Sequence, residues 1–202
     1  EAGGFVRSRF APDERADIQF HFVPAMLDDH GRNRLKGDGY TLHACYLHPR
    51  SRGRLTLQSA DPSRPPLIQA NYLSDPDGFD LKMMVEAARL SRDILRQPAF
   101  DRWRRDPIHP QREDLDDQAL AAFVRAKAET IYHPAGTCRM GNDARAVVDP
   151  QLRVNGLNGL RVVDASVMPT LVTGNTNAPT MMIAERAADL ILARSAQLAP
   201  VA

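Results

Sequence analysis

In the first third of the chain, apolar side chains alternate with other residues in a series of short segments, and this pattern limits the possible folds. In the first segment the alternating side chains are Ile18, Phe20 and Phe22. Strict alternation places such side chains on one face of a strand. Because turns and loops, not helices, link these segments, the pattern predicts antiparallel pairing. The segments that show it are residues 17–24, 40–47 and 54–59.

The flanking stretches are less regular. Residues 1–16 are polar and rich in glycine, which predicts a loop. Residues 60–73 contain Pro65 and Pro66. Proline cannot donate to a strand ladder, so this stretch predicts an extended segment with an edge strand.

Two helices follow. Residues 79–95 carry apolar side chains at steps of 4, 3 and 4, namely Met83, Ala87, Leu90 and Ile94. A second helix is expected after Asp116 and Asp117, whose carboxylates suit a helix start. Its apolar face is marked by Leu120, Phe123 and Val124. The sheet and these helices together predict an α+β architecture, an antiparallel sheet backed by helices.

The last third changes character. Short strand pieces separated by Asn-Gly turns are expected at residues 147–148, 152–154 and 160–163. A final helix is expected with Asn177 as its cap and Pro179 in its first turn, where a missing N–H costs nothing. Its buried stripe is predicted to be Ile183, Ala187 and Ile191.

Composition excludes several classes of function. The 26 Lys and Arg residues nearly balance the 25 Asp and Glu residues, so the chain lacks the basic stripe that nucleic acid needs. No apolar run is long enough to cross a membrane. The chain does not begin with Met, and we expect it to be a fragment of a longer polypeptide.

The stretch YHPAGTCRMG, residues 132–141, gathers the chemistry-bearing side chains, and the residues alone leave three interpretations open. Cys138 could act as a nucleophile with His133 as its base, but the sequence does not place the two in contact. A metal site could use His43 and Cys45, although their spacing matches no closed zinc site. His133 could also be a lone catalytic base.

A second stretch supports the third interpretation. Residues 173–180 place a glycine and two asparagines just before the final helix. A helix start offers free backbone N–H groups and partial positive charge, which stabilise a group that becomes anionic. The amide of Asn175 could hold a substrate oxygen beside a base.

Taken together, these stretches resemble the C-terminal half of the glucose–methanol–choline (GMC) family of FAD-dependent oxidoreductases. The similarity is to its choline dehydrogenase-like and aliphatic alcohol dehydrogenase-like members. The stretches that carry it are YHPAGTCRMG, VVDPQLRVNGLNGLRVVDASVMP and TGNTNAPTMMIAERAADLI, with HPRSRGRLTLQSADPSRPPLIQANYL upstream. No GxGxxG is present, and the family's FAD-gripping βαβ unit would carry one.

The resemblance implies a substrate-binding domain at residues 1–133. Residues 134–202 would hold the catalytic segment, with the strand and helix that complete the FAD-binding domain. It implies that His133 is the base and Asn175 its partner at the substrate. It also implies that Asp164 and Ala165 touch the FAD backbone, and that Thr176 and Asn177 lie against the flavin ring. The reaction would oxidise a primary alcohol, choline-like or aliphatic, to an aldehyde, because His133 can take the proton and only the flavin can accept the hydride.

The expected partners are therefore an alcohol, FAD, and quinone or oxygen as electron acceptor, with no metal. Most contacts to FAD would come from the family's N-terminal half, so we expect this chain to be inactive alone. We expect a cytoplasmic location, with peripheral association at the inner membrane as the alternative for the parent protein. The rival to an enzyme is a binding module that keeps the substrate-domain fold without the chemistry.

Overall fold

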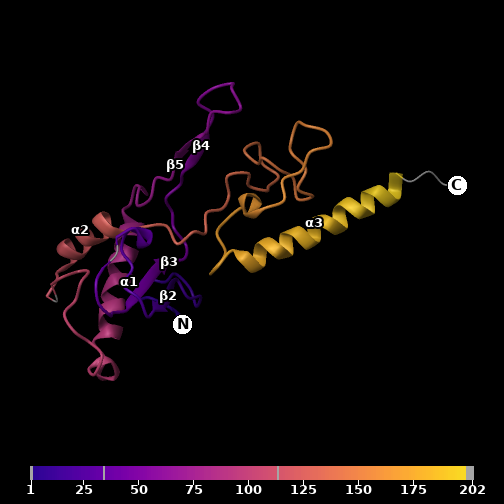
Figure 1. The fold of residues 1–202 in the computed structure, drawn as a ribbon. Helices are drawn as coiled ribbons and strands as arrows, with labels where there is room; N and C mark the ends of the chain where they lie inside the picture. Colours follow the sequence, from indigo (N-terminus) through magenta and orange to yellow (C-terminus); the bar gives the residue numbers. More distant parts are fainter. Residues whose placement is uncertain (1, 34, 113, 199–202) are drawn as a thin grey trace. The chain divides into compact units, whose positions relative to one another are not determined.

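The structure is a computed structural model that describes residues 2–33, 35–112 and 114–198, with side chains described up to residue 192 (Figure 1). The chain folds into two compact units. The first comprises Glu1–Gly53 and Ile68–Ile131, and the second comprises Arg54–Leu67 and Tyr132–Ala202. The expected division between two functional domains at residues 133 and 134 stays a prediction.

The first unit is built on a three-stranded antiparallel sheet with the order β1-β2-β3. The strands are β1 (Ala2–Val6), β2 (Ile18–Val23) and β3 (Thr41–Tyr46). The strands predicted in residues 17–24 and 40–47 are thereby confirmed, together with their antiparallel pairing. A separate two-stranded sheet pairs β4 (Arg54–Thr56) with β5 (Leu67–Gln69), which confirms the predicted strand in residues 54–59 and the edge strand.

The prediction of a loop for residues 1–16 is wrong at Ala2–Val6, because these residues form β1. Two glycines in this strand hide the usual strand signal, but Gly4 pairs with Phe20 across the sheet. At Gly3, an added Cβ would lie only 2.9 Å from the carbonyl oxygen of Phe20. The close approach of the two backbones therefore requires glycine at this position, and pairing with β2 overrides the local preference.

The sheet is covered by α1 (Phe79–Leu95), as its apolar stripe predicts. Ile18 and Phe20 of the sheet form a buried cluster with Met83 and Ala87 of the helix. The stripe fades toward the end of α1, where Leu90 is half-buried and the Ile94 side chain is 36% exposed. The stripe is therefore fully buried at Met83 and Ala87 but not at its C-terminal end.

A second helix, α2 (Asp117–Lys127), packs on α1. Leu120 and Val124 are buried against Val85. Asp116 caps the helix, since its carboxylate accepts a hydrogen bond of 2.8 Å from the amide of Ala119. This confirms the predicted helix start and the α+β architecture.

The start of α1 is fastened to the chain that follows β3 by a buried carboxylate. Asp80 is only 2% exposed, and its carboxylate accepts hydrogen bonds from the amides of Arg50 and Ser51, both at 2.8 Å, and from the Ser51 hydroxyl. A buried carboxylate is tolerated when such donors satisfy it.

The second unit consists mostly of turns around the helix α3 (Asn177–Leu198), drawn in yellow in Figure 1. The strand pieces predicted around residues 147–163 appear only as isolated bridges, which pair Val148 with Val154 and Arg153 with Arg161. Among the described residues there are also three short 3-10 helices, η1 (Asp29–Gly31) and η2 (Pro98–Phe100) in the first unit and η3 (Ala165–Val167) in the second.

The core of the second unit lies between these turns and α3. Its buried residues are Val148, Leu152, Val167, Met168, Ile183 and Ala187. The predicted stripe of α3 is confirmed at Ile183 and Ala187 but is wrong at Ile191, whose side chain is 43% exposed. The buried cluster of this unit takes Ile183 and Ala187 from α3 and does not include Ile191. Along the described residues, we find no helix with the length and apolar character needed to cross a bilayer.

Candidate active site

The segment that carries His133 is fastened to η3 by backbone hydrogen bonds. The amide of Cys138 donates to the carbonyl of Ser166 at 3.0 Å, and that of Met140 donates to the carbonyl of Val167 at 2.8 Å. Gly136 lies between His133 and these bonds with φ of +87°, in the left-handed region that favours glycine. Glycine at position 136 therefore permits the backbone conformation that this segment adopts beside η3.

His133 itself contacts the residue that precedes α3. Its Nδ1 lies 2.9 Å from Oγ1 of Thr176, which is 43 residues further along the chain. The Thr176 side chain is only 8% exposed. The Thr176 carbonyl in turn accepts the first hydrogen bonds of the helix, from the Thr180 amide at 3.0 Å and the Thr180 hydroxyl at 2.7 Å. A chain of contacts therefore connects α3, Thr176 and the His133 imidazole.

This contact leaves the other imidazole nitrogen for chemistry. A neutral imidazole has one protonated and one unprotonated nitrogen, whereas a hydroxyl can both donate and accept. With Nδ1 in contact with Thr176, Nε2 is the nitrogen of His133 that could exchange a proton with another molecule. The His133 side chain is half-buried, so it is partly accessible.

The two predicted asparagines flank Thr176. Asn175 and Asn177 are both exposed on the second unit, and Asn175 follows Gly174, whose φ is +132°. Helix α3 begins at Asn177, so this residue lies in the first turn and is not the cap that the sequence predicted. The Thr176 carbonyl starts the hydrogen-bond ladder of the helix, which moves the capping position to Thr176. Pro179 lies in the first turn, as predicted.

Asp164 and Ala165 lie at the start of η3, the element to which the His133 segment is bonded. The Asp164 carboxylate is exposed and accepts a hydrogen bond of 2.7 Å from the amide of Ser166. The structure therefore brings the six predicted site residues into one unit, on three connected elements. They are His133, Asp164, Ala165, Asn175, Thr176 and Asn177.

Two rival interpretations gain no support from this geometry. In the part of the chain that the structure describes, no hydrogen bond joins Cys138 to His133, whose imidazole instead contacts Thr176. His43 and Cys45 lie on β3 in the other unit. Burial lowers the pKa of His43, with His21 as a second cause, and burial raises the pKa of the Cys45 thiol. No trio of His, Cys, Asp or Glu side chains among the described residues is arranged to hold a metal.

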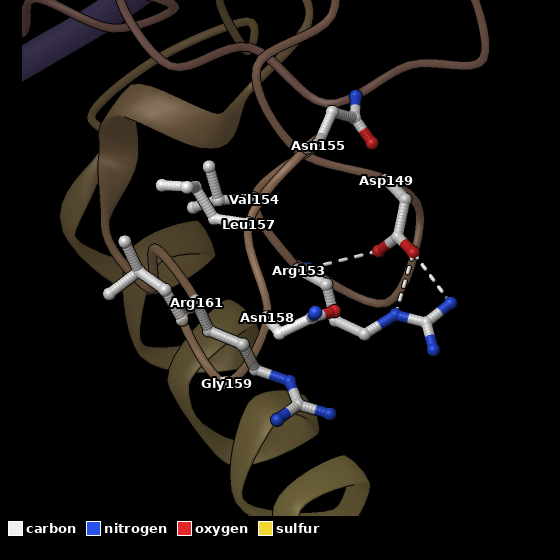
Figure 2. A pocket seen from close by; sticks show the side chains of 10 residues that line it. Asp149, Arg153, Val154, Asn155, Leu157, Asn158, Gly159 and Arg161 are labelled. Carbon is white, nitrogen blue, oxygen red and sulfur yellow. Dashed lines mark hydrogen bonds and ion pairs between the residues drawn. The ribbon is translucent and has the colours of Figure 1, made fainter.

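The second unit also contains a surface hollow of about 280 Å³. It is lined by a turn-rich stretch, residues 149 and 153–161, which does not include His133 or Asn175. Figure 2 shows the Asp149 carboxylate turned toward Arg153, whose Nε donates to it at 2.7 Å. The carboxylate also accepts hydrogen bonds from the backbone amides of Gln151 and Arg153, so its hydrogen bonds stabilise the turn that contains it.

The residues around α3 suit a flavin chemically. The first turn of a helix presents backbone N–H groups and partial positive charge, which favour the negative charge of a reduced flavin. Asn177 is exposed at this turn and carries an amide that can donate or accept. The Thr176 hydroxyl, in contrast, is buried and directed to His133, so only the backbone of this residue suits a contact with a flavin.

The sequence predicts His133 as the candidate base but does not predict its contact with Thr176. The family resemblance assigns Thr176 to the cofactor, and its contact with the imidazole has no local signal because the two residues are 43 positions apart. Only the folding of the HPAGT segment onto η3 and α3 brings them together.

Comparison with known proteins identifies the family of this chain. The GMC oxidoreductase family matches residues 49–184. An alcohol dehydrogenase [acceptor] from Pseudomonas putida is 52% identical over 95% of this chain and 34% of its own length. An oxygen-dependent choline dehydrogenase from Burkholderia cenocepacia is 47% identical over 96% of this chain and 34% of its own length. The chain thus spans about a third of the length of these curated relatives.

A solved structure shows the same fold. A variant of the formate oxidase of Aspergillus oryzae RIB40, studied for FAD modification, matches with a TM-score of 0.84 and 30% identity. The match covers 94% of this chain and 33% of that one. The motifs, the fold and the extent of the family match lead to one conclusion, that this chain belongs to the GMC oxidoreductase family.

Proposed function

We propose that the polypeptide carrying this chain is an FAD-dependent dehydrogenase that oxidises a primary alcohol, choline-like or aliphatic, to an aldehyde. The names of its relatives, alcohol dehydrogenase and choline dehydrogenase, support this substrate class. The observation that carries the proposal is the contact of His133 Nδ1 with Thr176, which holds the imidazole and leaves Nε2 to act as a base.

Each residue then has a distinct role. His133 Nε2 takes the hydroxyl proton of the alcohol, a kind of catalysis typically worth about 10²- to 10⁴-fold. When bound, FAD supplies the acceptor for the hydride that leaves the carbinol carbon. Asn175 donates a hydrogen bond to the substrate oxygen. Asn177 and the first turn of α3 stabilise negative charge on the reduced cofactor.

The remaining site residues orient the cofactor. Asp164 and Ala165 contact the FAD backbone, and the Thr176 backbone contributes beside Asn177. The electron acceptor that reoxidises the flavin is quinone or oxygen. Because the relatives are about three times longer, most FAD contacts are expected outside this chain, which alone should bind little FAD and lack turnover.

The test is His133→Ala in the natural polypeptide that carries this chain, loaded with FAD. We expect turnover of a primary alcohol to fall by at least 10²-fold while the flavin absorbance per protein stays the same. Near-wild-type turnover with full flavin content would exclude His133 as the base. A wild-type protein that binds choline or an aliphatic alcohol without reducing FAD would instead favour a non-catalytic binding module.

A further inference from the structure

We propose that Thr176 is a positioning residue that fixes the tautomer and orientation of His133. This inference rests on the proposed function, since it concerns how His133 acts as a base. The Thr176 Oγ1 atom lies 2.9 Å from His133 Nδ1, a normal length for a hydrogen bond. Among the described residues, Thr176 is the side chain that forms a hydrogen bond with this imidazole.

The chemistry of the imidazole determines the direction of the bond. If the Thr176 hydroxyl donated to Nδ1, the proton of neutral His133 would sit on Nε2, which then could not accept one from the substrate. A base at Nε2 therefore requires Nδ1–H, with the Thr176 oxygen as acceptor. Once Nε2 is protonated, both nitrogens carry hydrogens, and Nδ1–H still donates to the same oxygen. The contact is kept through the proton transfer, so the ring does not have to turn.

Thr176 is itself held rigidly enough for this task. Its carbonyl accepts two hydrogen bonds from Thr180, at 3.0 Å from the amide and 2.7 Å from the hydroxyl. Its side chain is only 8% exposed, and a β-branched side chain has few accessible χ1 rotamers. The position of Oγ1 is therefore set by the first turn of α3, and it sets the direction of the His133 ring in turn.

The matched pair of variants is Thr176→Val and Thr176→Ser, in the natural FAD-loaded polypeptide that carries this chain. Valine keeps the shape of threonine but removes the acceptor oxygen, whereas serine keeps the oxygen. We expect Thr176→Val to lower kcat by about 10-fold with little change in KM, and Thr176→Ser to recover most of it. A loss confined to KM, or an equal loss in both variants, would overturn the proposal.

A second measurement does not depend on turnover. In protein labelled with ¹⁵N in the histidine rings, the wild type should show His133 with a protonated Nδ1 and a bare Nε2 at high pH. Thr176→Val should shift the ring toward the Nε2–H tautomer. A wild-type His133 with the proton on Nε2 overturns the proposal without any variant, even if Thr176→Val fails to fold. If instead the ring has the expected tautomer but His133→Ala keeps full turnover, the proposed base fails and the contact with Thr176 stands.

Discussion

Thr176 Oγ1 lies 2.9 Å from His133 Nδ1, so one polar contact joins the HPAGT segment to the start of α3 across 43 residues of sequence. The contact lies within the second unit, which also contains Asn175 and Asn177. The proposed base and the helix start that would suit a reduced flavin are thus parts of one folded unit. Changes on either side of the contact should affect the site in distinguishable ways.

Asn175→Ala should lower kcat/KM for a primary alcohol by about 10- to 100-fold, because the substrate oxygen loses a hydrogen bond as charge develops on it. The measurement is steady-state kinetics of the FAD-loaded natural polypeptide. Asn142→Ala is the matched control, since Asn142 is an exposed asparagine in the same unit. Equal kinetics for the two variants would contradict a role for Asn175 at the substrate.

Cys138→Ala should leave alcohol turnover within about twofold of the wild type. The His133 imidazole contacts Thr176. The bond from Cys138 to Ser166 is made by the backbone amide of Cys138, not by its thiol. The same variant tests the rival interpretation of a cysteine nucleophile, which needs the thiolate itself. An esterase activity in the wild type that is lost in Cys138→Ala would support that rival.

Gly136→Ala should destabilise the segment that carries His133. At this position φ is +87°, and an added Cβ would lie 3.3 Å from the carbonyl oxygen of Met168. We expect a loss of about 2 kcal/mol in the free energy of unfolding, measured with urea.

Gly156→Ala is its matched control. Gly156 has a similar φ of +80° but no atom within 4 Å of an added Cβ, so only the backbone strain of about 1 kcal/mol applies. If the two variants lose the same stability, the close contact with Met168 contributes nothing.

Asp28→Asn should make the free energy of unfolding less dependent on pH in the acid range. Hydrogen bonds from the Lys127 ammonium, at 2.6 Å, and from the Asn33 amide lower the pKa of Asp28 from 3.8 to about 2. A carboxyl group whose pKa is lower in the folded state stabilises the fold above its unfolded pKa, and this stabilisation is lost as the pH falls toward 2. The variant should therefore be less stable than the wild type at pH 7, and the difference should shrink between about pH 5 and pH 2.

Urea unfolding at a series of pH values measures this difference. Asp77→Asn is the control, because the Asp77 carboxylate is 78% exposed and lies 3.6 Å from Arg50, a pair expected to contribute little. A constant difference between Asp28→Asn and the wild type across the pH series would show that the Lys127 pair does not stabilise the fold.

Local patterns predicted much of the fold. Alternation at Ile18, Phe20 and Phe22 predicted β2, and the spacing of Met83 and Ala87 predicted the buried face of α1. The carboxylate of Asp116 predicted the start of α2. These features depend on side chains a few residues apart, whose backbone geometry fixes which face they share.

Other features required the tertiary structure. The glycines of β1 give no strand signal, yet the strand forms because it pairs with β2. The backbone of β2 lies so close to Gly3 that this position requires glycine. Ile191 continues an apolar stripe but is 43% exposed and does not belong to the buried cluster of its unit.

The candidate site likewise has features that local sequence predicts and features that depend on tertiary packing. The family and the candidate base are predicted from local sequence, because His133 lies in a motif that is recognisable in ten consecutive residues. The contact of His133 with Thr176 is visible only in the folded unit, since a hydrogen bond between residues 43 positions apart depends on how the whole unit packs. Local patterns indicate on which face of its own helix or strand a side chain lies, whereas the packing of separate elements determines which other side chain it contacts.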